Sequence, residues 1–218
     1  MQNIPRIFFD AELETNKKLS VDKDVVHYLR RVMRRNDCLI FNNGDEFSAS
    51  LSDDNKFIVV GEKTEHIDPS NNLTLFFAPI KKIEDLLNMA TQMGVAVLQP
   101  VITKRTVANH INWERQLKII KEASEQSGRN SIPKLLKPIK FDDIKFDDSF
   151  VVADERAGHG MDIKNNTDGV EKILIGPEGG FAPEEFDKMR NVKSMSLGKT
   201  ILRAEVAGVV AIAKVLDK

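Results

Sequence analysis

From residue 73 onward the sequence alternates strand-like apolar runs with segments of helical spacing, and this alternation restricts the possible folds most strongly. Leu73–Ala78 is typical of a buried strand, and residues 81–93 carry their apolar side chains on one face of a helix that Gly94 ends. The later predicted elements are Val95–Leu98 (strand), Trp113–Ser127 (helix, stopped by Gly128), Phe150–Ala153 and Lys172–Ile175 (strands), a helix opened by Pro183, Ser194–Leu197 (strand) and Arg203–Leu216 (helix). This order predicts an α/β domain with a mainly parallel sheet and helices on both faces.

The first 70 residues have a different pattern, in which short β-type runs are separated by polar turns. Leu39–Phe41 precedes Asn42–Asp45, a strong turn signal, and Phe47–Leu51 alternates apolar and polar side chains as a half-buried strand does. Phe57–Val60 is a further strand. The pattern predicts a small barrel or sandwich. Because a polar stretch at 68–72 follows, we expect two domains, residues 1–70 and residues 73–218.

Composition restricts the class of protein. The 218-residue chain has a formal net charge of −1, and it has no run of ~18 apolar residues that would form a transmembrane helix. The N-terminus lacks the pattern of a secretory signal, and Cys38 is the only cysteine, which excludes an internal disulfide. No pair of histidines has metal-ligand spacing, so no metal site is predicted. These features favour a cytoplasmic protein with no membrane partner.

One cluster of cations departs from the overall neutrality. On a helix, His27, Arg30, Arg31 and Arg34 stand at i, i+3, i+4 and i+7 and share one face, whereas Val25, Val26, Leu29, Val32 and Met33 share the other. We expect the apolar face to pack on the β-domain and the cationic row to face phosphates. A solvated basic helix face would have the same spacing, so the spacing alone leaves both interpretations open.

The segment Ile175–Phe181 contains more glycine than a connection between a strand and a helix needs. Glycine permits positive φ angles and lets a ligand approach the backbone closely. The apolar strand before it and the helix after it place the segment at the carboxyl edge of a parallel sheet, where open α/β folds bind ligands. A tight structural turn is the alternative, and three glycines with a proline favour the ligand site.

A second loop, Leu197–Arg203, contains Gly198-Lys199-Thr200 and so imitates the end of a phosphate-binding P-loop. The glycine that a P-loop needs five positions before Gly198 is replaced by Lys193, and an apolar segment follows where the helix should begin. No Gly-x-Gly-x-x-Gly occurs, which argues against a dinucleotide site. The final helix is rich in Ala, Gly and Val, so we expect it to be buried against the sheet or a second subunit.

Both loops carry a family resemblance. Leu174–Gly180 and Leu197–Glu205 resemble the SPOUT superfamily of RNA methyltransferases. Within that superfamily the chain is similar to the family of enzymes that methylate uridine N3 in 16S ribosomal RNA of the small subunit. Three further segments resemble motifs of that family in the same order, namely Pro5–Phe8, His27–Arg34 and Glu122–Arg129.

The resemblance implies an N-terminal PUA-like β-barrel that binds RNA and a C-terminal SPOUT α/β domain with a trefoil knot. It also implies a homodimer, 16S ribosomal RNA or the small ribosomal subunit as partner, and S-adenosylmethionine as cofactor. By position, the cofactor pocket would comprise Ile175, Gly176, Pro177, Glu178, Gly179, Gly180, Leu197, Gly198, Ile201 and Leu202, with Arg203 and Glu205 beside the methyl donor.

The sequence departs from the family at two places. Where the family often has Thr after the glutamate of its last motif, this chain has Val206. Where the helix after the first strand usually carries Gln-Lys and a later Glu before Leu-Gly, this chain has Asn88-Met89 and Gln92-Met93. The second departure argues against the polar role expected of that helix and against full activity, but it affects neither cofactor loop.

Methylation of uridine N3 requires the imide anion, which a nearby cation would stabilise. The cations that could do this are Arg6, Arg30, Arg34, Arg129 and Arg203. The predicted catalytic residues are Arg203, Glu205 and Arg6. The predicted RNA contacts are Arg6, His27, Arg30, Arg31, Arg34 and Arg129. Two other functions stay open. The chain could be a SPOUT methyltransferase of a ribose 2′-hydroxyl or a transfer RNA, or a non-catalytic RNA-binding protein.

Overall fold

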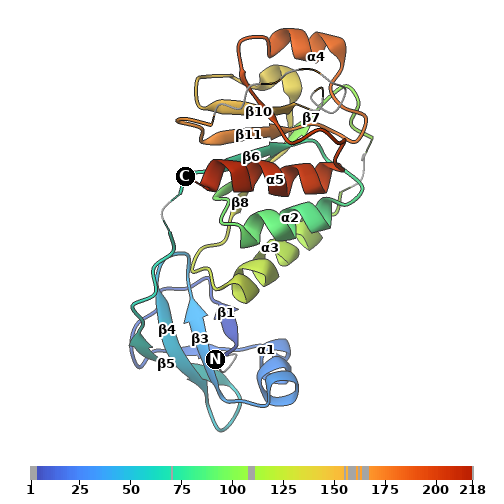
Figure 1. Cartoon of the computed structure of the whole chain (residues 1–218). Coiled ribbons are helices and arrows are strands. Elements are labelled where there is room, and N and C mark those ends of the chain that lie inside the picture. The colour runs from blue at the N-terminus through green and yellow to red at the C-terminus, as the bar shows by residue number, and fades with distance from the viewer. Residues whose placement is uncertain are drawn as a thin grey trace. The chain divides into compact units, whose positions relative to one another are not determined.

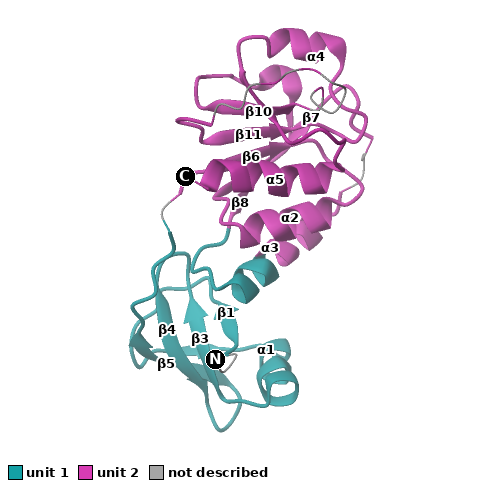
Figure 2. Ribbon diagram, in the orientation of Figure 1, with its two compact units in different colours: residues 1–69, 121–132 teal, residues 70–120, 133–218 magenta. Residues whose placement is uncertain are grey.

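The computed structural model describes residues 4–69, 71–107, 111–154, 156, 161, 163 and 167–217. The chain forms two compact units, residues 1–69 with 121–132 and residues 70–120 with 133–218 (Figure 2). Residues 121–132 therefore belong to the N-terminal unit, although the boundary expected near residue 70 groups them with the second domain. The helix α3 (Trp113–Ser127) is divided between the units at Ile120.

Within the described residues, the N-terminal unit contains a curled five-stranded sheet in the order β1-β3-β4-β5-β2 (Figure 1). The strands are β1 (Arg6–Phe8), β2 (Lys18–Ser20), β3 (Asp37–Phe41), β4 (Glu46–Leu51) and β5 (Phe57–Lys63). β1 runs parallel to β3, and the other neighbours are antiparallel. The sheet has the form of a half-barrel, which confirms the expected small β-domain.

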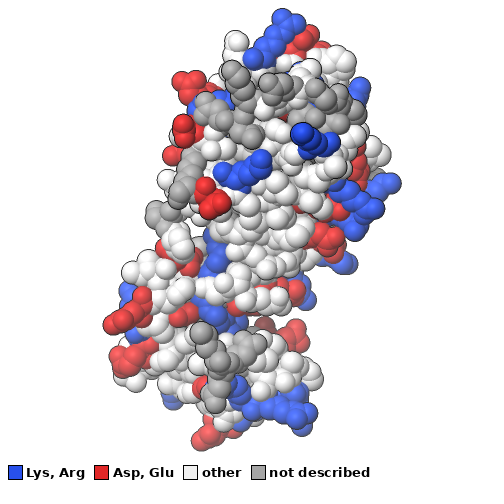
Figure 3. Space-filling view, in the orientation of Figure 1, with Lys and Arg blue, Asp and Glu red and all other residues white. Residues whose placement is uncertain are grey.

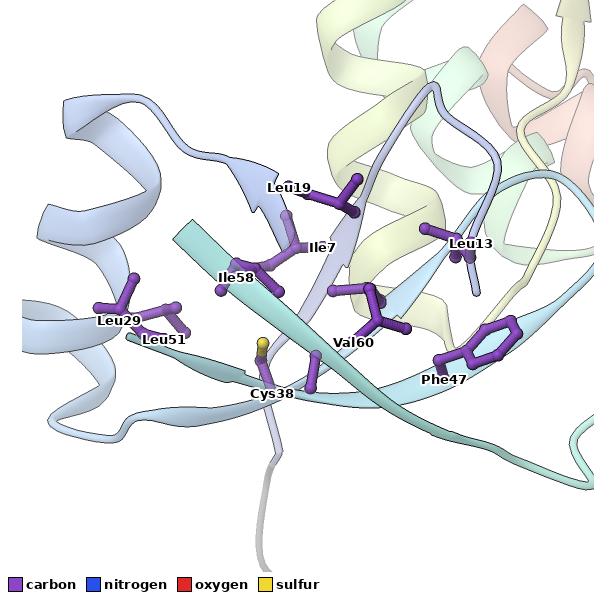
Figure 4. Close-up of a cluster of buried hydrophobic side chains, with 11 residues drawn as sticks. Ile7, Leu13, Leu19, Leu29, Cys38, Phe47, Leu51, Ile58 and Val60 are labelled. Carbon is purple, nitrogen blue, oxygen red and sulfur yellow. The ribbon is translucent and has the colours of Figure 1, made fainter. Parts of the chain in front are cut away.

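One apolar cluster fills the concave side of this sheet (Figure 4). The alternation of β4 explains how it forms, because Phe47, Ala49 and Leu51 are buried while Ser48 and Ser50 are exposed. Leu19 from β2 joins the cluster although β2 was not predicted, since a strand of three residues contributes only one buried side chain.

The basic segment is not one α-helix. A short helix α1 (Lys23–His27), capped by the Asp22 side chain, passes into a π-helix η1 (Tyr28–Met33), and Arg34 follows at φ 55° in the left-handed region. A π-turn is wider than an α-turn, so the i, i+3, i+4, i+7 row does not keep one face. Leu29 is buried as expected, but the prediction for Val32 is wrong, because its side chain is 59% exposed.

The second unit contains a parallel sheet in the order β12-β10-β11-β6-β7-β8, with β9 paired to β7, among the residues that the structure describes. The strands are β6 (Thr74–Phe77), β7 (Val97–Ile102), β8 (Lys134–Leu135), β9 (Ile139–Lys140), β10 (Phe150–Asp154), β11 (Lys172–Ile175) and β12 (Lys193–Ser196). Every pairing of these strands is parallel, which confirms the predicted α/β class.

Helices cover both faces of this sheet. α2 (Ile83–Gln92) and α5 (Ala204–Leu216) lie side by side on one face (Figure 1). Gly208 of α5 permits this close packing, because a Cβ there would lie 2.4 Å from Leu86 Cδ1. On the other face, α4 (Pro183–Lys188) and the 3-10 helix η2 (Phe141–Asp143) cover an apolar cluster that includes Val152 and Leu174.

The parallel arrangement decides where loops meet. β12, β10, β11 and β6 are consecutive neighbours, so the loops that follow these four strands all leave the sheet at its carboxyl edge. The trefoil knot implied by the resemblance stays a prediction. None of the helices in the described part of the chain is both long and apolar enough to cross a membrane.

Candidate functional site

A cavity of about 450 Å³ lies at the carboxyl edge of the sheet in the second unit. Its walls come from the ends of β10 and β11, from the loops after β6, β11 and β12, and from the first turn of α5. The lining residues are Lys81, Lys82, Ala153, Asp154, Ile175, Gly176, Pro177, Glu178, Phe181, Leu197, Gly198, Thr200, Ile201, Leu202, Arg203, Ala204, Glu205 and Ala207. The fold thus brings the two loops singled out in the sequence together in one cavity, although they are separated along the chain.

The glycine-rich loop after β11 forms a tight wall of this cavity. A Cβ on Gly176 would lie 2.9 Å from Phe181 Cε2, so only glycine lets the backbone lie against the buried Phe181 ring. Gly180 adopts φ 68° and donates its N–H to Pro177 O at 2.9 Å, which closes the turn. Gly179 and Gly180 do not line the cavity, and the other eight predicted pocket residues do.

A second segment, residues 103–106 after β7, holds this loop from outside the cavity. Arg105 Nη1 donates to Gly179 O at 2.9 Å. The backbone N–H of Lys104 donates to Glu185 Oε1 at 2.9 Å, and Glu185 Oε2 accepts from Ala182 N at 2.7 Å at the start of α4. Glu185 is buried, so both of its oxygens are satisfied by backbone. No local pattern predicted these contacts, since the partners lie far apart along the chain.

The loop after β12 is shaped by Gly198, whose φ of 124° is unfavourable for other residues. Gly198 N donates to Ser196 Oγ at 3.2 Å, and Lys214 Nζ from α5 donates to Ser196 O at 3.0 Å. Ile201 is 65% exposed and Leu202 half-buried, so the loop presents apolar side chains at the cavity. These contacts fix the start of the loop, whereas its tip lies at the surface.

Three carboxylates line the cavity, and two of them have partners. The Asp154 side chain is 1% exposed and pairs with Arg156, with Nη2 and Oδ2 2.6 Å apart. Glu178 Oε1 accepts from the backbone N–H of Lys81 at 3.3 Å. Glu205, at 7% exposure, makes no hydrogen bond or ion pair with any other residue that the structure describes. It is the one buried acid of the cavity wall in that part of the chain with no partner.

The lining also includes cations that the sequence did not indicate. Lys81 and Lys82 join Arg203 as exposed positive side chains at the cavity. Asp154 and the two lysines follow predicted strands. Loops after parallel strands meet at one edge of the sheet, so these residues could have been placed at the cavity once the strand order was known. Within the described ranges, no three His, Cys, Asp or Glu side chains are placed to hold a metal ion.

Arg6 does not belong to this cavity. Its guanidinium is nearly buried in the N-terminal unit and pairs with Glu46, with Nη2 and Oε2 2.6 Å apart. It also donates to Arg129 O at 2.9 Å and to Asn130 Oδ1 at 2.5 Å, and it stacks on the Phe41 ring. Arg6 therefore joins β1 to residues 129–130 of its own unit. Its interactions differ from those expected of a residue that contacts a substrate.

Three of the other predicted RNA contacts, His27, Arg30 and Arg31, border a hollow of about 730 Å³ in the N-terminal unit. Its other lining residues are Val21, Asp22, Lys23, Val26 and Asn55. Arg30 Nε donates to Asn55 Oδ1 at 2.9 Å, and its Nη1 also contacts Asn36. His27, Arg31 and Arg34 are exposed. Lys and Arg side chains gather over this end of the unit, where α1 and η1 lie (Figure 3).

Arg129, the remaining predicted contact, is half-buried, and burial lowers the pKa of its guanidinium. Its Nη2 donates to Ser131 Oγ at 3.1 Å. The interactions of Arg129 therefore differ from those of the exposed cations of α1 and η1.

Known proteins resemble this chain along most of its length. The model of a family described as an RNA methyltransferase domain matches residues 68–216. The chain is 35% identical over 229 residues to ribosomal RNA small subunit methyltransferase E of Rickettsia conorii, covering 96% of this chain and 94% of the relative. It is 28% identical over 198 residues to the protein of that name from Mesomycoplasma hyopneumoniae, covering 84% of this chain and 86% of the relative.

A solved structure has the same fold. The crystal structure of a ribosomal RNA small subunit methyltransferase E from Neisseria gonorrhoeae bound to S-adenosyl methionine superposes with a TM-score of 0.85. The match covers 99% of this chain and 98% of that one, at 23% identity. At this level of identity the similarity concerns the fold alone.

Proposed function

This chain belongs to the family of ribosomal RNA small subunit methyltransferases E, and from that premise we propose that it methylates uridine N3 of 16S ribosomal RNA with S-adenosylmethionine as donor. The observation that carries the proposal is the cavity at the carboxyl edge of the parallel sheet, where both motif loops meet. The relatives act on ribosomal RNA by name. The N3 position and the 16S molecule are our assignment.

The cavity fits the donor in size and in chemistry. Its volume of about 450 Å³ lies within the roughly 300–1,000 Å³ of pockets for small organic ligands. Gly176 leaves space against Phe181, and the unpartnered Glu205 offers a charge for a cationic ligand. We assign the binding to Ile175, Gly176, Pro177, Glu178, Leu197, Gly198, Ile201 and Leu202, with Gly179 and Gly180 shaping the turn. When bound, the cofactor supplies an electrophilic methyl carbon on a sulfonium.

Arg203 is our candidate for preparing the nucleophile. Uridine N3 carries a proton and is a poor nucleophile until the imide anion forms. Arg203 is exposed at the cavity and occupies the N-cap position of α5 without a side-chain capping hydrogen bond, so its guanidinium is available to a base that enters. A cation there stabilises the imide anion that forms when the N3 proton passes to solvent water. Methyl transfer then forms the bond from N3 to carbon and breaks the bond from sulfur to carbon, with the electron pair left on sulfur.

The RNA contacts are assigned to the exposed cations of α1 and η1. His27, Arg31 and Arg34 are free to meet phosphates, and Arg30 orders the turn at Asn55 at the rim of the hollow. Arg129 is half-buried and is retained only as a secondary contact. The predicted catalytic and RNA-contacting roles of Arg6 are not tested by the structure. Because its guanidinium pairs with Glu46 and backbone carbonyls within its own unit, we propose a structural role for it instead.

A homodimer is part of the proposal. α5 exposes Val206 at 41% and Leu216 at 39%, and the preceding loop exposes Ile201 at 65%. Figure 3 shows an area without charged side chains over α2 and the adjoining part of α5. Val206 and Met89, two of the departures from the family pattern, add apolar atoms to these helices. An exposed apolar area of this kind marks an interface, and a second copy of the chain is the proposed occupant.

The decisive experiment compares ribosomal RNA from cells with and without this protein. Mass mapping should show one uridine base methyl missing from 16S RNA when the protein is absent, and restored when it is returned. A missing ribose methyl or a missing transfer RNA methyl would favour the other SPOUT chemistries. No change in any RNA, with no binding of S-adenosylmethionine, would favour a non-catalytic RNA-binding protein. Since ribosomes are the substrate source, the proposed location is the cytoplasm.

A further inference from the structure

Glu205 is the unusual ionisable group of the cavity. It stands at the second position of α5, the residue is 7% exposed, and it lines the cavity wall. A buried carboxylate is normally paired with a cation or hydrogen-bond donors, because burial of an isolated charge is costly. Glu205 makes neither kind of contact with the rest of the described chain. Its oxygens are therefore available to something that enters the cavity.

Glu205 stands beside a positive helix end, and no other charged group of the described lining pairs with it. Glu205 lies in the first turn of the thirteen-residue helix α5, where unsatisfied N–H groups produce a positive end. The two other carboxylates of the lining are engaged, Asp154 with Arg156 and Glu178 with the Lys81 N–H. The cations Lys81, Lys82 and Arg203 are exposed at the cavity, and none of them forms an ion pair with Glu205.

We propose that Glu205 is the countercharge for the sulfonium of the methyl donor, so that the cavity distinguishes the cationic donor from the neutral thioether product. This inference rests on the proposed function. Transfer of the methyl group leaves its electron pair on sulfur, so the ligand loses its positive charge while Glu205 keeps its negative charge. The attraction between them therefore exists before transfer and disappears afterwards, which favours product release. Glu205 in this role contacts the donor and is not the base that removes the N3 proton.

Calorimetric titration without RNA measures this selectivity directly. Three ligands are compared: S-adenosylmethionine, its ammonium-bearing analogue sinefungin, and S-adenosylhomocysteine, which is uncharged at sulfur. The variant is Glu205→Gln, which keeps the size of the side chain and removes its charge. The control is Asp187→Asn, an exposed carboxylate on α4 that pairs with Arg190 and does not line the cavity.

Glu205→Gln should weaken both cationic ligands by roughly tenfold, the lower range for a contact with a charged group. It should change the affinity for S-adenosylhomocysteine by less than about twofold, and Asp187→Asn should change none of the three. An equal loss for all three ligands, or no loss for any, would overturn the inference. If wild-type protein binds none of the ligands, the proposed function fails, and that result is distinct from binding without charge selectivity.

Discussion

Replacement of Arg6 by alanine should destabilise the N-terminal unit without slowing methyl transfer in the protein that remains folded. The Arg6 and Glu46 side chains are 10% and 5% exposed, and the truncation leaves the Glu46 carboxylate without its cation. One hydrogen bond remains to Glu46 Oε1, from Thr64 Oγ1 at 2.8 Å. Breaking a buried ion pair by removing one partner costs about 3–5 kcal/mol. Because Arg129 O and Asn130 Oδ1 lose their donor as well, we expect the upper half of that range.

Urea unfolding of wild type, Arg6→Ala, Glu46→Gln and the double variant measures this effect. The double variant should be less destabilised than the sum of the single variants, with a coupling of about 1 kcal/mol or more, because the two side chains act on each other. Single-turnover methylation at saturating RNA should proceed at the wild-type rate in Arg6→Ala below its unfolding temperature. A variant of unchanged stability with a rate reduced by about tenfold or more would refute the structural assignment and restore Arg6 as a catalytic residue.

Three further perturbations test separate features. Gly208→Ala places a Cβ 2.4 Å from Leu86 Cδ1, and overpacking should cost about 1–3 kcal/mol of unfolding free energy in a urea titration. Gly176→Ala places a Cβ 2.9 Å from Phe181 Cε2. Because Gly176 lines the cavity, calorimetry should show at least about tenfold weaker donor binding. Wild-type affinity would argue against the assigned loop. Burial raises the pKa of Cys38 to about 12; its thiolate is therefore scarce at pH 8, and a thiol reagent should label Cys38 only after unfolding, so rapid labelling of the native protein would contradict its burial.

The pH dependence of stability follows from the same thiol. Because the folded-state pKa of Cys38 lies above its ordinary value of 9.0, the neutral form is favoured in the fold. This contribution is fully present below pH 9 and is lost as the pH rises toward 12. Cys38→Ala should therefore flatten the loss of stability over that interval, and an identical slope in both proteins would show that another group is responsible.

The long elements of the fold were predictable because their patterns are local. The helix over Trp113–Ser127 and the strand over Lys172–Ile175 have the predicted bounds. Short strands such as Lys134–Leu135 were missed, because two residues are too few to show an alternation of apolar and polar side chains. The π-helix after His27 was also missed, because the spacing of apolar and basic residues there is that of an α-helix.

The candidate site was predictable only where a motif contained it. The loops at 176 and 198 carry glycines whose close contacts or positive φ angles leave a visible signature. Asp154 and Lys81 line the cavity because of the order of the strands in the sheet, and no local sequence pattern predicts that order. Arg6 was predicted to contact the substrate because Pro5–Phe8 resembles a family motif, and that resemblance does not reveal that its partners are Glu46 and residues 129–130.

The central claim is that the loops after β11 and β12 form one site for the methyl donor. Hydrogen–deuterium exchange with and without S-adenosylmethionine tests it most directly, because it reports where binding restrains the backbone. Binding should slow exchange in residues 176–181 and 197–205 together and leave the strands of the N-terminal unit unchanged. Donor binding that leaves both loops unprotected, or that protects a different region, would contradict the account.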